Sequence, residues 1–314
     1  MRRTRCYGGM NPIGHESYHR GLLEEAVGMR SLVPTSWIAA TVAAILFEIV
    51  FPLALAVFVQ RRLKIGWRYF FYGVIIFGLF QLVSRVPVLE VLGVVLAPHL
   101  KSSRAFLFAF LGMEALTAGI FEEVGRYVGY RWLMGKERKD WPKAVFYGLG
   151  HASLESVVLV AGLSALTLVN VLVIQAIGVD ALPAAQRGQV TQQLAAIAAQ
   201  PGWLPLLGAY ERVCTIAVHI ALSVIVLQVF TRGQIRWLFV AIGAHALVDG
   251  VAAFLPQFVH LGAVRNALLV EGVITVFGLI ALWVIFALRP RRAEAPEASD
   301  ANPPPQPASQ ALGG

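Results

Sequence analysis

Seven stretches of the chain are almost wholly apolar, and short polar segments separate them. They cover residues 36–59, 69–98, 105–134, 143–178, 203–230, 237–256 and 264–288. An α-helix rises about 1.5 Å per residue and needs about 20 apolar residues to cross a bilayer. The pattern therefore predicts an all-α, polytopic transmembrane bundle of about seven spans, or of eight if the fourth stretch is split.

Two of these stretches are longer than a single crossing requires. The second contains Arg85 and Pro87, so we expect a break or a re-entrant turn near them. The fourth continues to Gly178 and is expected to tilt or kink.

The ends of the chain have a different composition from the apolar part. Residues 1–35 form a polar N-terminal segment, which is either a real part of the protein or an over-extended start, since Met29 lies just before the first span. Residues 36–288 form the membrane-embedded domain. Residues 289–314 are rich in Pro, Ala and Ser, and we expect a disordered cytoplasmic tail there.

Composition and charge agree with a membrane protein. Only 14% of the 314 residues are charged, against about 25% in soluble domains. The net charge of +8 does not form one basic face and therefore does not indicate a nucleic-acid partner. The basic residues instead form short clusters between apolar stretches: Arg61, Arg62, Lys64 and Arg68; Lys136, Arg138, Lys139 and Lys143; Arg232 and Arg236; Arg289, Arg291 and Arg292.

These clusters predict an orientation. Lys and Arg are enriched in cytoplasmic loops, and all the clusters lie on one side only if the number of spans is odd. We therefore expect an external N-terminus and a cytoplasmic C-terminus. The two cysteines, Cys6 and Cys214, are far apart and indicate neither a disulfide framework nor a Cys-rich metal site.

Ionisable residues recur inside the apolar stretches, where each costs roughly 2.5–3.5 kcal/mol to insert. The third span contains Glu122, Glu123 and Arg126. Glu122 and Arg126 share a helix face and can pair. Glu123 is rotated away, and we expect it to lack such a partner.

The fourth and sixth spans repeat one arrangement, a histidine followed four residues later by a carboxylate. The pairs are His151 with Glu155 and His245 with Asp249. In each, the carboxylate can accept an imidazole N–H and fix the tautomer. Small residues surround His151, namely Gly148, Gly150, Ala152 and Ser153, and they predict close approach of another helix.

The fifth span adds Glu211, Arg212 and His219 as a second tier of candidates. We interpret Glu211 and Arg212 as a structural pair near the outer end. Counted from the basic ends of their helices, Glu123, His151, His219 and His245 share a depth of about 12–18 Å. This common depth predicts one site. Other intramembrane charges are interpreted as pairing or edge residues: Glu48, Arg85, Glu90, Glu114 and Glu271.

The charge of this predicted site needs compensation. Five carboxylates face two arginines and three histidines. With neutral imidazoles, about three negative charges would stand uncompensated in a low dielectric. Protonated carboxylates, imidazolium or a divalent metal ion would each resolve the excess, and each gives a group capable of acid–base or water-activating chemistry.

These motifs together resemble those of the YhfC family of bacterial intramembrane proteases and, more distantly, the CAAX-protease (bacteriocin-processing) and PrsW families. The resemblance covers residues 36–288. It implies hydrolysis of peptide bonds in a membrane protein or lipidated peptide, within the bilayer of the bacterial cytoplasmic membrane. It assigns Glu123 or Glu122 as the base and His151 as the residue that orients water.

By the same resemblance, His245 and Asp249 would form the oxyanion side and Arg126 would hold the glutamates. Two features depart from the related families. Only Val124 and Gly125 separate Glu123 from Arg126, where the CAAX-type pattern has three residues, and Asp249 stands where many relatives have Asn.

Alternatives remain open at this stage. We favour metal-independent glutamic catalysis over a zinc site, which would be made of Glu123, His151 and His245. The main functional alternative is a proton-coupled transporter or carrier with an intramembrane Glu/His relay. An inert accessory subunit of a membrane complex is the third interpretation.

Overall fold

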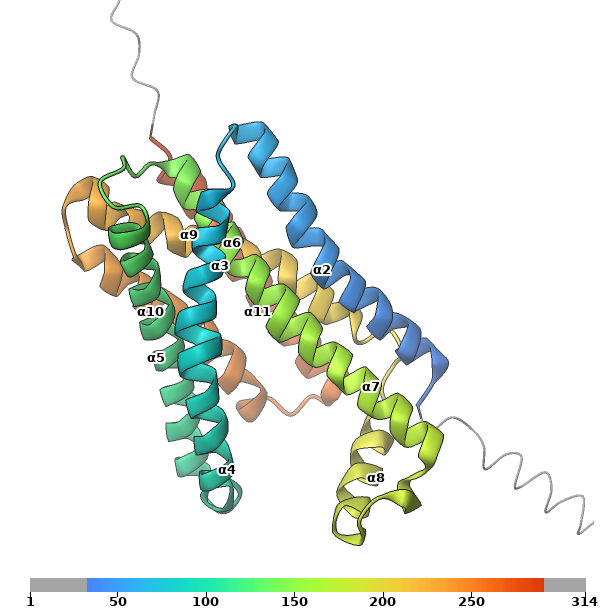
Figure 1. The fold of residues 1–314 in the computed structure, drawn as a ribbon. Helices are drawn as coiled ribbons and strands as arrows, with labels where there is room; N and C mark the ends of the chain where they lie inside the picture. The colour runs from blue at the N-terminus through green and yellow to red at the C-terminus, as the bar shows by residue number, and fades with distance from the viewer. Residues whose placement is uncertain (1–32, 291–314) are drawn as a thin grey trace, which may run out of the picture.

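The computed structural model describes residues 33–290, and within this range the chain is helical without a β-strand (Figure 1). The helices are α2 (Thr35–Leu63), α3 (Arg68–Phe77), α4 (Val86–Ser102), α5 (Arg104–Val128), α6 (Trp141–Leu154), α7 (Ala161–Ile177), α8 (Ala184–Ala198), α9 (Leu206–Arg232), α10 (Arg236–Phe258) and α11 (Ala263–Ala287). Shorter segments are the π-helical η1 (Gly78–Arg85), η2 (Gly129–Leu133) and η3 (Glu155–Val160) and the 3-10 turn η4 (Val179–Ala181). The predicted ends, 1–35 and 289–314, lie almost wholly outside the described residues.

The seven predicted spans are confirmed. Seven helical runs among the described residues are long and apolar enough to cross a membrane. Three of these runs join consecutive elements: α3–η1–α4, α5–η2 and α6–η3–α7. The fourth run is continuous from Trp141 to Ile177, so the version with eight spans is not adopted.

The prediction of a break or a re-entrant turn near Arg85 and Pro87 is wrong. The helix continues from Arg68 to Ser102, and the π-helical η1 ends at Arg85. Pro87 then falls in the first turn of α4. A π-helical turn shifts the hydrogen-bond ladder by one residue, and the missing N–H of a proline costs least near the start of a new α-helical register. The irregularity expected in the fourth span is present as η3.

One helix was not predicted from the sequence. The loop between the fourth and fifth spans contains α8, whose Leu194 is buried against Leu168 and Val171 of α7. Its other residues are mostly small or polar, so it shows no apolar periodicity that would mark a span. Leu194, the one buried residue of α8, packs it against α7.

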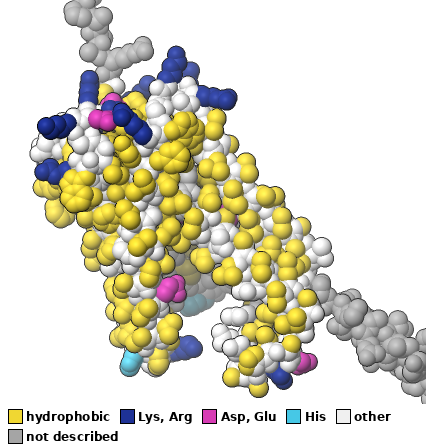
Figure 2. Space-filling model, in the orientation of Figure 1, with side chains coloured by type: hydrophobic (Ala, Val, Ile, Leu, Met, Phe, Trp, Pro, Cys, Tyr) yellow, Lys and Arg dark blue, Asp and Glu magenta, His cyan; other side chains and the backbone are white. Residues whose placement is uncertain are grey.

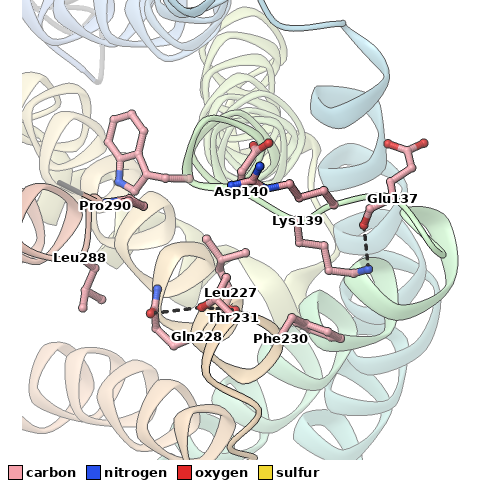
Figure 3. Close-up of a pocket in the computed structure, with 11 residues that line it drawn as sticks. Glu137, Lys139, Asp140, Leu227, Gln228, Phe230, Thr231, Leu288 and Pro290 are labelled. Atoms are coloured by element: carbon pink, nitrogen blue, oxygen red, sulfur yellow. Dashed lines mark hydrogen bonds between the residues drawn. The ribbon is translucent and has the colours of Figure 1, made fainter. Parts of the chain in front are cut away.

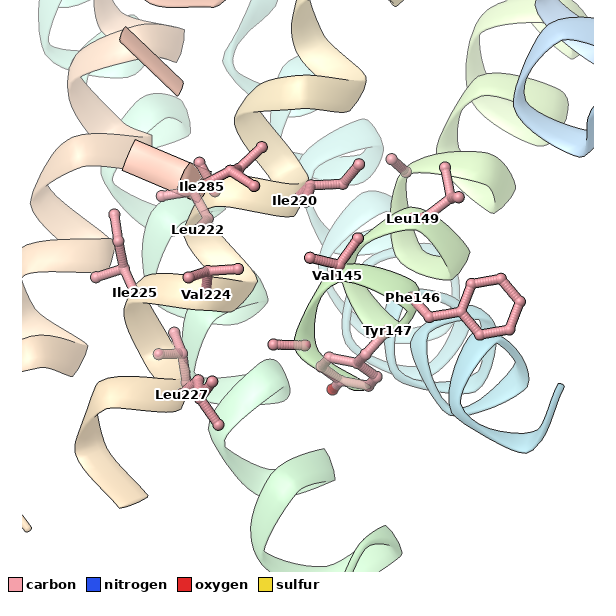
Figure 4. Close-up of a cluster of buried hydrophobic side chains, with 14 of the residues drawn as sticks. Val145, Phe146, Tyr147, Leu149, Ile220, Leu222, Val224, Ile225, Leu227 and Ile285 are labelled. Atoms are coloured by element: carbon pink, nitrogen blue, oxygen red, sulfur yellow. The ribbon is translucent and has the colours of Figure 1, made fainter. Parts of the chain in front are cut away.

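The core of the bundle is α9. Of its most apolar stretch, 83% is buried inside the protein, against 17–28% for the other spans. It packs against α2, α5, α6, α10 and α11. Figure 4 shows Val145 of α6 beside Ile220 and Val224 of α9 in this core.

The small-residue surface predicted around His151 is confirmed. A Cβ atom on Gly150 would lie 1.9 Å from the backbone oxygen of Phe70 on α3, and one on Gly148 would lie 2.8 Å from the Cα atom of Ile220 on α9. The backbones of α3 and α9 therefore contact α6 directly on two sides. This contact fixes the position of His151.

One end of the bundle carries most of the positive charge, and we call it the basic end, defined by Arg62, Arg68, Lys143, Arg232 and Arg289. Figure 2 shows Lys and Arg side chains grouped there, at the top of the view. The helices α2, α9 and α11 end at this level, and α3, α6 and α10 begin there. The clustering agrees with the predicted orientation, and its assignment to the cytoplasm stays a prediction.

The opposite end is hollowed. Figures 1 and 2 show two projections, one made of α4 with the adjoining part of α5 and the other of α7 with α8, and the surface recedes between them. The bundle is therefore tightly packed near the basic end and open at the other.

Candidate active site

Three charged residues of α5 form the buried base of the site. Arg126 and Glu123 are completely buried, and the guanidinium donates to Glu123 Oε1. The Arg126 Nη2 atom also lies 3.5 Å from Glu122 Oε2, so the predicted Glu122–Arg126 pair is present. The expectation that Glu123 lacks a partner is wrong, because residues three apart on a helix also share a face. One guanidinium thus serves both carboxylates.

The carboxylate of Glu122 lies at the centre of the cluster. Its Oε2 atom is 2.8 Å from His151 Nε2, 3.7 Å from His219 Nδ1 and 3.8 Å from His245 Nε2. The histidines come from α6, α9 and α10. The prediction that these residues form one cluster agrees with these distances, since side chains from four separate spans meet here.

Glu155 has a different partner from the one predicted. The hydrogen bond of His151 goes to Glu122, whereas Glu155 Oε2 lies 2.7 Å from His219 Nε2. Glu155 still follows His151 by one turn, since its N–H bonds to the His151 backbone oxygen. The two side chains take different partners from neighbouring helices, Glu122 on α5 for His151 and His219 on α9 for Glu155.

Arg212 joins Glu155 to Glu211. Its guanidinium donates to Glu155 Oε1 at 3.0 Å and to Glu211 Oε1 at 2.5 Å. The predicted Glu211–Arg212 pair is confirmed. The pair is also connected to the cluster, because Glu155 contacts His219.

The protonation of His219 follows from its neighbours. Arg126 Nη2 lies 2.7 Å from His219 Nδ1, and a guanidinium can only donate. Nδ1 therefore accepts, and the proton of a neutral imidazole resides on Nε2, the atom that faces Glu155. In this arrangement Arg126 fixes the tautomer of His219.

His245 has a carboxylate near each of its ring nitrogens, and one of the two is within hydrogen-bond distance. Its Nδ1 atom is 2.7 Å from Glu123 Oε1, and its Nε2 atom is 3.6 Å from Asp249 Oδ2. The predicted His245–Asp249 pair is thus a close approach beyond hydrogen-bond distance. When a carboxylate binds one nitrogen of an imidazole, the ring is held in one orientation and its other nitrogen is directed into the site. Histidine ligands and bases are commonly oriented in this way.

The cluster is closed on one side and accessible on the other. The side chains of Glu155 and Asp249 are 18% and 39% exposed, whereas those of Glu123 and His151 are fully buried. Glu155 follows His151, and Asp249 follows His245, along helices that start at the basic end. Both therefore lie farther from that end than the histidines. Access to the cluster is from the hollowed end.

Two residues of the second span complete the cluster and were not predicted. The amide of Gln81 is buried and donates to Glu122 Oε1, and Arg85 Nη1 donates to Gln81 Oε1 at 3.2 Å. Arg85 also donates to the backbone oxygen of Glu114 at 2.5 Å. The sequence signal was the i,i+4 spacing of these two polar residues in an apolar stretch. Arg85 was interpreted only as a pairing residue.

The donor atoms suit a divalent metal ion. Glu122, His151, Glu155 and His219 each offer one ligand atom, and these atoms all lie within 4.8 Å of one another. Imidazole and carboxylate are zinc ligands in proteins, so the chemistry of the set fits zinc. Of the predicted ligands Glu123, His151 and His245, only His151 belongs to this set, because Glu123 is held by Arg126 and His245.

A separate pocket of about 550 Å³ lies at the basic end. Figure 3 shows polar side chains in its lining that already have partners: Lys139 donates to the backbone oxygen of Glu137, and Thr231 lies within hydrogen-bond distance of Gln228. The pocket contains none of the cluster residues. It is therefore distinct from the candidate active site.

Comparisons with known proteins cover this part of the chain. The profile of a family described as "YhfC intramembrane metalloprotease" matches residues 45–274. A protein of Bacillus subtilis (strain 168), "Uncharacterized membrane protein YhfC", is 31% identical over 247 residues, which are 76% of this chain and 91% of the relative. No solved structure matches. The matched range contains every residue of the cluster.

Proposed function

The chain belongs to the YhfC family, and on that premise we propose that it is an intramembrane protease that hydrolyses peptide bonds of membrane proteins or lipidated peptides. The observation that carries the proposal is the Glu122 carboxylate, which lies among three histidines from three spans. Burying several ionisable groups inside a membrane bundle costs free energy. Such groups are therefore rare and mark functional sites. We place the protein in the bacterial cytoplasmic membrane with its basic end in the cytoplasm.

Glu122 is the general base in this proposal. Its Oε2 atom would take a proton from the attacking water, while Gln81 holds Oε1 and thereby fixes the orientation of the carboxylate. His151 Nε2 lies within hydrogen-bond distance of the same Oε2. It would share the transferred proton and pass it to the leaving amine.

His245 and Arg126 would handle the developing charge. Arg126 neutralises the buried glutamates. Glu123 holds His245 Nδ1, and a proton on His245 Nε2 would be donated to the carbonyl oxygen as it becomes negative. Asp249, 3.6 Å from that atom, would stabilise the protonated ring.

Zinc fits this site as a cofactor. Glu122, His151, Glu155 and His219 would hold it. When bound, it would polarise the substrate carbonyl and make a water molecule more acidic. The bond from Arg126 to His219 Nδ1 favours the alternative, metal-independent mechanism, because it leaves the proton of His219 on Nε2.

The proposal is tested by replacing Glu122 and His151. We expect Glu122→Gln and His151→Ala each to lower cleavage by at least about a hundredfold, the usual contribution of a general acid or base. The measurement is comparative proteomics of membrane peptides from cells that contain the wild-type or the variant protein. Glu90→Gln, at an exposed intramembrane carboxylate of α4, is the matched control and should retain full cleavage.

The metal is tested on the same proteins. Purified wild-type protein should contain about one zinc ion per chain if the four side chains hold it, and Glu155→Gln should lose most of it while Glu90→Gln keeps it. Active wild-type protein without metal would instead support the glutamic mechanism. Full cleavage by both Glu122→Gln and His151→Ala would contradict the proposed active site.

One observation favours a second function, a proton-coupled transporter. Carboxylates and imidazoles lie in contact through the cluster, Glu122 with His151 and Glu155 with His219, and chains of Asp, Glu and His serve as proton relays. Reconstituted protein that moves protons in response to a solute gradient, and that releases no peptide fragments, would support this alternative.

A further inference from the structure

Another cavity lies between α2 and α7, outside the cluster. It has a volume of about 410 Å³ and is closed on its third side by the segment between α8 and α9. On α2 it is lined by Trp37, Thr41, Ala44 and Glu48, which share one helix face. These positions span about 16 Å along the helix. The cavity therefore extends from the hollowed end, where α2 begins, to the middle of the membrane.

Glu48 lies at the inner end of this cavity and lacks a partner. The residue is 1% exposed, and its Oε2 atom makes no hydrogen bond within residues 33–290. A carboxylate buried at this depth is costly unless it meets a donor. The structure therefore leaves a buried acceptor without a donor in the wall of the cavity.

The rest of the lining does not supply that donor. Glu48 is the one charged residue among those that line the cavity. The hydroxyls of Thr41 and Thr167 already donate to backbone oxygens of their own helices, at 2.8 and 2.9 Å. The remaining walls are largely apolar, including Leu163 and Leu204. A ligand that fits here has an apolar stem and a single donor group at its tip.

The cavity adjoins the candidate active site. Ser156 donates to the backbone oxygen of Glu48 at 2.7 Å, and it follows Glu155 of the cluster directly. On the other side, a Cβ atom on Gly208 would lie 3.3 Å from Glu48 Oε1, and Gly208 is less than one helical turn before Glu211. A peptide held at Glu48 would therefore lie beside the cluster.

We propose that this cavity receives a Lys or Arg side chain of the substrate, with its charged tip at Glu48 and its alkyl stem against the apolar walls. Long basic side chains bury their stems in this way. The inference rests on the proposed protease function and specifies its substrates: membrane peptides with a basic residue near the cleavage site. Because an uncharged side chain would leave Glu48 unpaired, the site would discriminate against it.

The first experiment compares cleavage sites. Cells with wild-type protein should yield membrane-peptide cleavage sites enriched in Lys or Arg within a few residues of the cut. Glu48→Gln should lose the enrichment while total cleavage of other peptides is retained, and Glu48→Lys should shift the preference to Asp or Glu. Glu90→Gln should behave as wild type. An equal loss at all sites in Glu48→Gln would indicate a structural role and overturn the proposal.

The second experiment does not depend on catalysis. Two synthetic Leu/Ala-rich transmembrane peptides, identical except for a single Lys or Gln, are titrated into liposomes that contain full-length Glu122→Gln protein. The Lys peptide should bind at least about tenfold more tightly, and Glu48→Gln should remove the difference. Equal binding of the two peptides would refute the cavity assignment even if the protein is a protease. Preferential binding without any cleavage by the wild type would contradict the protease function alone.

Discussion

The helices α6 and α4 are both apolar and both belong to long membrane spans, yet their surroundings differ. Every residue of α6 from Ala144 to Ser153 is buried, whereas no residue of α4 is buried. The candidate site uses His151 of α6, and the carboxylate of α4, Glu90, is exposed. Ionisable side chains therefore take part in the site where protein surrounds the helix, because only protein can supply partners at that depth.

The largest difference between the two regions is expected when the buried cation is removed. Arg126→Met should lower the free energy of unfolding by about 3–5 kcal/mol, because it leaves Glu122 and Glu123 buried without compensation. Lys101→Met, at an exposed position of α4, should change it by less than about 0.5 kcal/mol. Unfolding in mixed micelles measures both.

The outcome for Arg126 also tests the charge assignment. Arg126→Lys keeps the charge and should recover part of the lost stability. A variant Arg126→Met as stable as the wild type would mean that the glutamates do not carry the buried charge ascribed to them.

A glycine pair tests the packing itself. Gly150→Ala should destabilise the protein by about 1–3 kcal/mol, because its Cβ atom would overlap the backbone oxygen of Phe70. Gly93→Ala in α4 meets nothing within 4 Å and should be neutral or stabilising by up to about 1 kcal/mol. Thermal unfolding of the two variants gives the comparison, and equal effects would show that α3 and α6 are not in direct contact.

The smallest effect is expected at the basic end, outside the membrane spans. The hydroxyl of Tyr69 donates to Glu137 Oε2 at 2.6 Å, and this bond, together with Arg68, lowers the pKa of Glu137 below its ordinary value of 4.5. A lowered pKa in the folded state stabilises the protein above pH 4.5, and the contribution is lost as the pH falls through the lowered value.

The pH dependence of unfolding measures this effect. The wild type should exceed Glu137→Gln slightly in stability at neutral pH, and the difference should vanish in acid. A difference that grows as the pH falls would have the wrong sign and contradict the assignment. Glu90→Gln, at an exposed position of α4, provides the control.

The seven spans, the basic clusters and the common position of the cluster along its helices could be predicted from the amino-acid sequence alone. These features follow from local quantities: apolar length, charge, and a rise per residue that is the same for every α-helix. For the same reason the sequence predicted that Glu123, His151, His219 and His245 would meet at one level.

The contacts between individual side chains could not be predicted in this way, because they depend on how the helices pack. The i,i+4 pairing of His151 with Glu155 failed because Glu122 of α5 and His219 of α9 lie closer to the two side chains. Gln81 entered the site because η1 packs against α5, which carries Glu122. Such pairings depend on helix rotation and on contacts between residues far apart in the chain. Helical spacing fixes the face of a side chain only within its own helix, so the neighbour that meets that face is set by packing.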